Sequence, residues 1–125
     1  MNEKKIIDEI SQLMLDKKAL DVKIINVIGL TSLTDYFINC SAQSDPQTRA
    51  IKNHIEEQLL EKYKIKPSHI EGYEGLRWIL MDYINIVINI FHEEERKYYD
   101  IERLWGDGKV KREFLYVCDA FVLYI

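Results

Sequence analysis

The sequence predicts one α+β domain of the broad α/β class, a mixed sheet of about five strands with helices packed on it. The first observation is a long apolar stretch, in which the runs 78–83 and 86–91 both alternate in strand fashion. Both faces of each run are largely apolar, which is typical of central strands buried on two sides and joined around Ile84-Asn85. The second observation is that helical and β-branched patterns alternate around this stretch. We therefore expect helices on both faces of the sheet.

The first third of the chain predicts a helix followed by two strands. From Glu3 to Leu20, helical spacing places a buried stripe on Ile6, Ile7, Ile10, Leu13, Met14 and Lys17. The segment Asp21–Ile28 is rich in β-branched residues and predicts a first strand. Asp35–Ala42 predicts a second strand, antiparallel to the first because the connection is short.

A second helix has clear start and stop signals. Asp45 can accept hydrogen bonds from the amides of a first helical turn, and Pro46 suits the first helical position. The helix is expected to continue to about Tyr63 and to stop before Pro67.

The remaining elements complete the order α-β-β-α-β-β-β-α. A short strand is expected at His69–Glu71, before the two central strands. A third helix is expected over 93–105, with three acidic residues in its first turn and glycines at 106–108 to end it.

Composition favours a soluble cytoplasmic protein. The 125 residues carry a net charge of −4, and the only compact basic cluster lies at 109–112. An acidic balance fits a basic protein partner better than nucleic acid. The two cysteines, Cys40 and Cys118, match no metal-ligand spacing and indicate a reducing compartment. No apolar stretch reaches the ~20 residues that span a bilayer, and the N-terminal pattern contains no signal core.

Catalytic signals are weak. The three histidines are scattered singly, so no metal site is predicted. Asp35 and Asp82 could project from neighbouring strands and hold magnesium, which leaves a nucleotidyltransferase-like, magnesium-dependent enzyme as an alternative. The sequence has no P-loop, no GxGxxG and no Gly-Ser dipeptide for phosphate chemistry. We therefore predict no enzyme and no cofactor.

Trp78 follows Arg77 at the start of its strand, and both are residue types that dominate binding hot spots. A small non-catalytic binding domain is the reading that the residues favour.

Four blocks in this order resemble the ribosomal silencing factor family, also called the Iojap or RsfS family. The blocks are Thr34-Asp-Tyr-Phe-Ile38, Ser44-Asp45 with Arg49-Ala-Ile51, Glu71-Gly72 with Trp78-Ile-Leu-Met-Asp-Tyr83, and Phe91-His92 through Arg96, Tyr99 and Leu104 to Trp105-Gly-Asp107. No single block is specific, but four in register are a strong signal. They indicate a family domain over 1–108 and an extension of unknown role over 109–125.

The resemblance implies a nucleotidyltransferase-like fold that lacks the catalytic motif. It also implies binding to the large ribosomal subunit through its ribosomal protein fourteen, a steric block to joining of the small subunit, and repression of translation when nutrients are scarce. A homodimer is implied for the free protein. No membrane and no specific nucleic-acid contact are implied, and a ribosome assembly adaptor is a further alternative.

The matching positions imply a set of partner contacts. We expect Trp78 to be an aromatic anchor with Asp82 and Tyr83 beside it. Supporting contacts are expected from Asp35, Tyr36, Ser44 and Arg49. As an alternative, Asp35 and Arg49 pair with each other to fix a loop.

The sequence departs from the family pattern in three places. The turn usually reads Tyr-Gly-Asp, whereas here it reads Tyr83-Ile84-Asn85, and a β-branched residue at a position suited to positive φ implies a different turn or some strain. Asn89 stands where a histidine is common. The extension 109–125 is the third departure, because most members end soon after the last block.

Overall fold

The computed structural model describes residues 3–72, 75 and 77–94. Its elements are α1 (Glu3–Asp16), β1 (Leu20–Asn26), β2 (Tyr36–Ala42), α2 (Asp45–Tyr63), β3 (His69–Glu71), β4 (Trp78–Asp82) and β5 (Ile86–His92). The helix expected over 93–105 lies outside the described residues except for its first two positions. The expected cap at 106–108 and the extension 109–125 also lie outside them.

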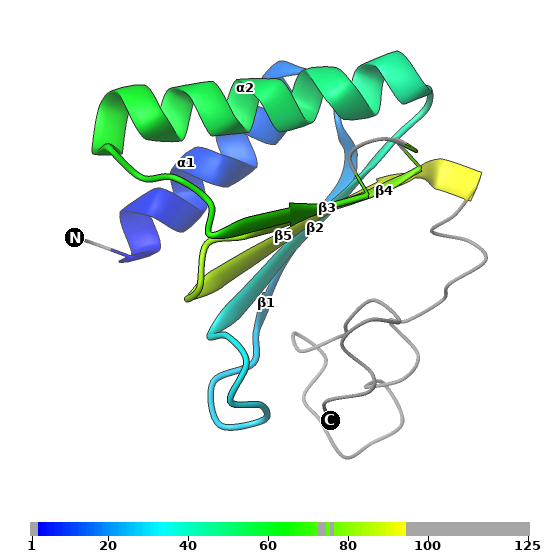
Figure 1. Ribbon diagram of the computed structural model, residues 1–125. Helices are drawn as coiled ribbons and strands as arrows, with labels where there is room; N and C mark the ends of the chain where they lie inside the picture. The colour runs from blue at the N-terminus through cyan, green and yellow to red at the C-terminus, as the bar shows by residue number, and fades with distance from the viewer. Residues whose placement is uncertain (1–2, 73–74, 76, 95–125) are drawn as a thin grey trace.

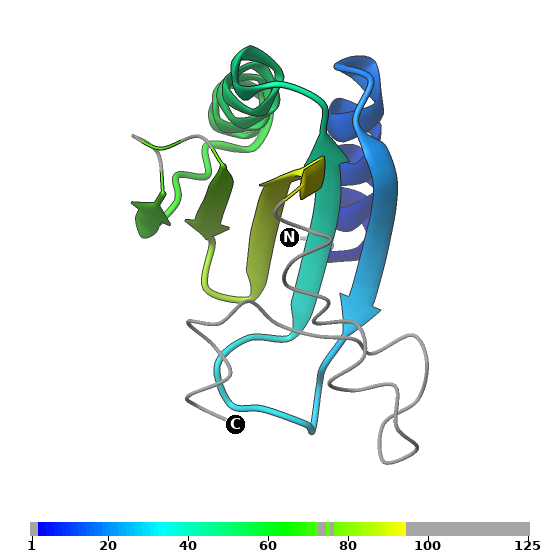
Figure 2. The ribbon, with the colours of Figure 1, turned by 90° about the vertical axis from the view of Figure 1, so that its right-hand side faces the viewer.

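The described strands form one mixed five-stranded sheet in the order β1-β2-β5-β4-β3 (Figures 1 and 2). β2 and β5 pair in parallel, with Tyr36 opposite Ile86 and Ala42 opposite His92. The other three pairings are antiparallel, including the predicted one between β1 and β2. The predicted α+β class with a mixed sheet is therefore confirmed.

β5 is the centre of this sheet, and all of its 7 residues are buried. α1 and α2 both lie on one face of the sheet (Figure 1). The apolar cluster beneath them includes Ile10, Ile55 and Ile88. A smaller cluster on the opposite face is formed by Ile25, Val27, Phe37, Leu80, Val87 and Phe91. Within the described residues, helical cover is thus confirmed for one face only.

The first helix and strand differ from the predicted bounds. α1 ends at Asp16, four residues early, because the chain turns through Lys18 with a φ of 62°. Lys17 consequently lies outside the helix and is exposed, so its assignment to the buried stripe was wrong. The Gln47 side-chain amide of α2 donates to the carbonyls of Lys17 and Lys18 at 3.1 and 2.9 Å. β1 ends at Asn26, before the predicted limit.

α2 begins and ends within one residue of the prediction. The residue that caps it is Ser44 rather than Asp45, because the Ser44 hydroxyl accepts a hydrogen bond from the Gln47 amide at 3.2 Å. Pro46 lies in the first turn, as expected. The helix ends at Tyr63, where Lys64 adopts the left-handed conformation. Across the described residues, no helix is long and apolar enough to cross a membrane.

The β4–β5 hairpin closes through a γ-turn. Ile84 has a φ of 75°, and the Asn85 amide donates to the Tyr83 carbonyl at 3.0 Å across it. The Ile84 amide donates to the Asp82 carboxylate at 2.7 Å, which holds the turn in place. Of the two outcomes expected here, a different turn or strain, the structure has the strained one, because the β-branched Ile84 has a positive φ.

Replacing Ile84 with glycine should stabilise the protein. Ile84 is 64% exposed, so little packing is lost, while glycine adopts positive φ without steric cost. The greater entropy of glycine in the unfolded chain offsets part of this gain, which leaves about 0.5–1 kcal/mol. Urea denaturation measures the difference. Ile84→Ala removes the β-branch but keeps a Cβ and should fall between glycine and the parent; a destabilised Ile84→Gly variant would contradict the assigned strain.

Candidate functional site

The seven predicted contact residues fall at two ends of the sheet. Ser44, Arg49 and Trp78 lie at the end where α2 and β4 begin, which we call the α2-start edge. Asp35, Tyr36, Asp82 and Tyr83 lie at the other end, beside the β4–β5 turn, which we call the hairpin edge. The structure thus separates the predicted contact residues into two groups, whereas the sequence analysis placed Asp82 and Tyr83 beside Trp78.

Two predicted groupings are wrong for this reason: Asp82 and Tyr83 beside Trp78, and the ion pair between Asp35 and Arg49. Trp78 and Asp82 begin and end β4, which places them about 13 Å apart at 3.3 Å per residue. Tyr83 packs against the cluster under the helices, whereas Trp78 packs on the opposite face. The alternative ion pair fails too, because Asp35 precedes β2 and Arg49 follows it, about 20 Å away along the strand.

Trp78 is held in a fixed orientation on the face opposite the helices. Its ring lies 5.0 Å from that of Phe91 at an interplanar angle of 34°. Its indole N–H donates to the Asn89 side-chain oxygen at 3.2 Å. The Asn89 amide in turn donates to the Asn39 side-chain oxygen at 3.0 Å. Trp78 itself is half-buried.

This chain of side chains is unusual because both asparagines are completely buried. The Asn39 amide nitrogen has no hydrogen-bond partner among the described residues. Buried polar groups of this kind cost free energy unless they are paired. Asn89 was noted in the sequence only as a departure from a common histidine, and the structure shows what it does: it orients Trp78.

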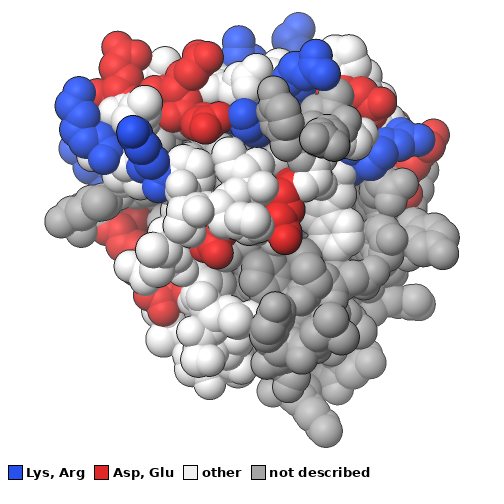
Figure 3. All heavy atoms as spheres, in the orientation of Figure 1, with Lys and Arg blue, Asp and Glu red and all other residues white. Residues whose placement is uncertain are grey.

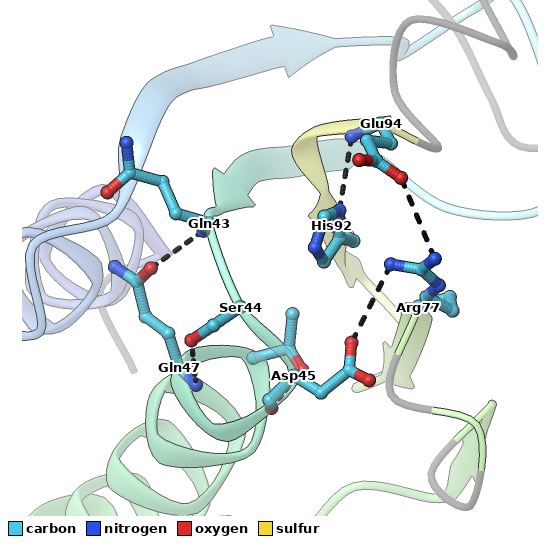
Figure 4. A network of polar contacts seen from close by, with 8 residues as sticks. Gln43, Ser44, Asp45, Gln47, Arg77, His92 and Glu94 are labelled. Carbon is cyan, nitrogen blue, oxygen red and sulfur yellow. Dashed lines mark hydrogen bonds and ion pairs between the residues drawn. The ribbon is translucent and has the colours of Figure 1, made fainter.

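A second polar network lies at the α2-start edge (Figure 4). The Arg77 guanidinium is 3.9 Å from the Asp45 carboxylate and 3.6 Å from that of Glu94. The Arg77 carbonyl accepts a hydrogen bond from the His92 amide at 2.7 Å. The His92 ring accepts one from the Glu94 amide at 3.2 Å through Nδ1, so the neutral ring carries its proton on Nε2.

Sequence reasoning did not assign Asp45, His92 or Glu94 to this network. Arg77 is adjacent to the predicted anchor Trp78, and His92 belongs to one of the four family-like blocks. The sequence therefore marked both residues as candidates, although not their contact. Their contact was not predictable because it depends on the register of β4 against β5, in which Trp78 is opposite Phe91. The two ion contacts are long and half-exposed, so each contributes at most about 1 kcal/mol.

At the hairpin edge, the described residues do not form the paired-carboxylate site that Asp35 and Asp82 were considered for. Asp35 and Asp82 do not lie on neighbouring strands, because β5 runs between β2 and β4 and separates them by about 10 Å. The Asp82 carboxylate accepts the Ile84 amide instead. Residues 3–72, 75 and 77–94 contain no group of three or more His, Cys, Asp or Glu that could hold a metal. The two-carboxylate magnesium site is therefore not formed by this geometry.

The fold and its two edges define a class of protein. It is a small α+β domain in which a half-buried aromatic residue, held by a buried asparagine, lies beside a charged edge. Such an arrangement is typical of a surface that another molecule contacts.

Comparison with known proteins identifies the family. The chain belongs to the ribosomal silencing factor family, because the family model described as "Ribosomal silencing factor during starvation" matches residues 1–119. This match confirms the resemblance and extends beyond residue 108 into the C-terminal segment.

Individual relatives agree with this assignment. A ribosomal silencing factor from Bacillus subtilis is 37% identical over 108 residues, covering 86% of this chain and 91% of that protein. A crystal structure of a Chromobacterium violaceum protein has a TM-score of 0.79 and 28% identity, and the match covers 96% of each chain. A mouse protein named "mitochondrial assembly of ribosomal large subunit protein 1" is 29% identical, covering 79% of this chain and 44% of its own length.

Gly72 is expected to be essential for the start of β4. It has a φ of +76°, and a Cβ at this position would overlap the carbonyl oxygen of Trp78. Gly72→Ala should therefore lower the free energy of unfolding by about 2–3 kcal/mol. Gly75→Ala is the matched control, since nothing lies within 4 Å of its added Cβ. Thermal unfolding of the two variants measures the difference, and equal stability would contradict the close approach to Trp78.

Asn89 should be required for both stability and the orientation of Trp78. Asn89→Leu removes its two hydrogen bonds and leaves the Asn39 side chain buried without a partner, at a cost of about 1–3 kcal/mol. Replacing Asn39 with leucine as well removes the stranded amide, so the double variant should be less destabilised than the sum of the two single variants. Urea unfolding gives the energies, and the indole N–H signal of Trp78 in NMR spectra reports its environment. Additive effects would contradict the coupled chain.

Proposed function

We propose that the protein is a translation repressor that acts by binding. In this proposal it binds the large ribosomal subunit through ribosomal protein fourteen and sterically prevents the small subunit from joining. It acts in the cytoplasm, is a homodimer when free, and uses neither a cofactor nor a covalent step. The observation that carries the proposal is membership of the ribosomal silencing factor family.

The contact surface that we propose is centred on the α2-start edge. Trp78 is the anchor, because a half-buried aromatic residue that is already immobilised loses little entropy on binding. Ser44 and Arg49 lie at the same edge and are proposed as supporting contacts.

The hairpin edge is proposed as a second contact region. It contains Asp35, Tyr36, Asp82 and Tyr83, and its exposed Ile84 projects at the turn. A partner that contacts both edges has to extend along the length of β4, about 13 Å.

Charge supports a basic protein partner. The net charge is −4. Acidic and basic side chains are intermixed over the helical layer in Figure 3, without a basic stripe among the described residues of that view. A phosphate-backbone contact usually requires such a stripe, so we propose no direct specificity for nucleic acid.

Ribosome assembly is a second candidate function. It is favoured by the name of the mouse relative, which assigns that protein to assembly of the mitochondrial large subunit. An adaptor for assembly would use the same large-subunit contact at an earlier stage. The two functions differ in outcome, because an assembly factor changes the yield of mature large subunits and a silencing factor changes their joining.

A subunit-joining assay with purified ribosomal subunits tests the repressor function. Added protein should reduce formation of joined ribosomes and should cosediment with large subunits. Trp78→Ala should weaken cosedimentation at least about tenfold, as expected for loss of a hot-spot aromatic residue. Leu80→Ala is the matched control, since Leu80 packs in the same cluster but is only 5% exposed.

Three results would contradict parts of this proposal. Unchanged joining at saturating protein would exclude repression. Full cosedimentation of Trp78→Ala, or equal loss in Leu80→Ala, would exclude Trp78 as the anchor. Immature large subunits accumulating in cells that lack the protein, with normal joining in vitro, would favour assembly.

A further inference from the structure

His92 is the last residue of β5 and lies where β5, the start of β4 and the start of α2 meet (Figure 4). It is buried, with 8% of its surface exposed. Its backbone amide donates to the Arg77 carbonyl at 2.7 Å, which ties the end of β5 to the residue that precedes β4. His92 is therefore central to the α2-start edge, although it is not one of the seven predicted contact residues.

The His92 ring caps the helical turn that begins at Glu93. Its Nδ1 atom accepts a hydrogen bond from the amide of Glu94, the second residue of that turn, at 3.2 Å. A side-chain acceptor at this place satisfies one of the amides that a helix start leaves without a partner, and serine, threonine, aspartate and asparagine are the usual residues. Histidine differs from them, because a proton can occupy its acceptor nitrogen between about pH 5 and 8.

Protonation of the ring removes this cap. An imidazolium has a proton on both nitrogens, so Nδ1 becomes a donor that faces the Glu94 amide, which is also a donor. The positive ring then lies at the amino end of a helical turn, where the helix dipole favours negative charge. The neutral ring of His92 holds the Glu94 amide, and the charged ring cannot.

The effect of this hydrogen bond extends to Arg77, because the Glu94 side chain holds it. The Glu94 carboxylate is 3.6 Å from the Arg77 guanidinium, which is also 3.9 Å from the Asp45 carboxylate of α2. Arg77 directly precedes Trp78 in the chain. A displacement of Glu94 therefore changes the contacts of the residue next to the proposed anchor.

The charged groups around the ring act on its charge in both directions. Asp45 of α2 and the neighbouring Glu93 and Glu94 favour a positive ring, whereas the Arg77 guanidinium opposes it. The three carboxylates outnumber the one guanidinium, so a proton that enters the ring meets no excess of positive charge. The surroundings thus permit a charged ring, and its cost is the lost cap.

We propose that His92 is a pH-dependent positioning residue of the α2-start edge. The neutral ring holds the Glu94 amide and keeps Arg77 in the arrangement of Figure 4. The charged ring releases Glu94, and the contacts of Arg77 loosen with it. The inference rests on the proposed function only for its consequence, which is weaker binding to the large ribosomal subunit at low pH.

NMR spectra of the free, full-length protein test this switch without ribosomes. At about pH 7.5 the nitrogen shifts of the His92 ring should show the tautomer with its proton on Nε2, because Nδ1 is the acceptor. Between about pH 7.5 and 5.5 the Glu94 amide signal should shift with the same midpoint as the His92 ring. The indole N–H signal of Trp78 should follow them. The ring of the exposed His69 provides a separate titration for comparison.

His92→Asn separates the hydrogen bond from the proton. The asparagine side-chain oxygen can accept the Glu94 amide but gains no proton in this range. The parent protein should cosediment with large subunits about fivefold more weakly at about pH 5.5 than at about pH 7.5, the value of about one hydrogen bond. His92→Asn should bind as the parent does at the higher pH and should lose this dependence.

Two further variants complete the set. His92→Ala has no acceptor at either pH and should bind weakly at both. His69→Asn is the matched control, because it removes an exposed histidine from β3 and should keep the pH dependence of the parent protein.

Two NMR results would overturn the proposal whether or not the protein binds ribosomes. A neutral His92 ring with its proton on Nδ1 would exclude the cap. A Glu94 amide signal that does not follow the His92 titration would exclude its release. In the binding assay, equal pH dependence of the parent protein and His92→Asn would exclude His92 as the source. Absence of binding by the parent protein at either pH would instead count against the proposed function, and the NMR titration then decides the switch.

Discussion

The complete burial of β5 is the constraint on which the rest of the structure depends. This strand is hydrogen-bonded along both edges and covered on both faces, so each neighbour is restricted by it. Its parallel partner β2 requires a long crossover connection, which includes α2 and returns the chain across one face of the sheet. Its antiparallel partner β4 requires a tight turn, and that turn is short enough to place Ile84 in a strained conformation.

The same strand supplies the supports of the candidate contact surface. Three of its residues hold the start of β4: Asn89 orients the Trp78 indole, Phe91 packs against the ring, and the His92 amide binds the Arg77 carbonyl. The accessible side chains are therefore on one strand and their supports are on the next. Burying the two asparagines Asn39 and Asn89 lowers stability. Their hydrogen bonds fix the orientation of Trp78.

Local features of this fold were predictable, and long-range ones were not. Helical periodicity and the start of α2 depend on neighbouring residues, and the sequence predicted them to within a few positions. The end of α1 was not predicted, because Lys17 fits the helical spacing. In the structure, the carbonyls of Lys17 and Lys18 accept hydrogen bonds from the Gln47 side chain of α2, a long-range contact that the spacing does not reveal. The separation of Trp78 from Tyr83, and of Asp35 from Asp82, depends on strand order. A strand inserted between two others leaves no trace in their own sequences.

The pairing of β2 with β5 also has a consequence for the order in which the chain is made. Asn39 and Asn89 are in contact although 50 residues separate them. During synthesis, β2 therefore leaves the ribosome with the edge that will later receive β5 still open. An open, apolar strand edge invites pairing with other chains, and domains of this type are vulnerable to aggregation until the late strand arrives. A nascent chain that stops before Ile86 lacks the centre of its sheet, so this domain is committed to folding only once most of it has been translated.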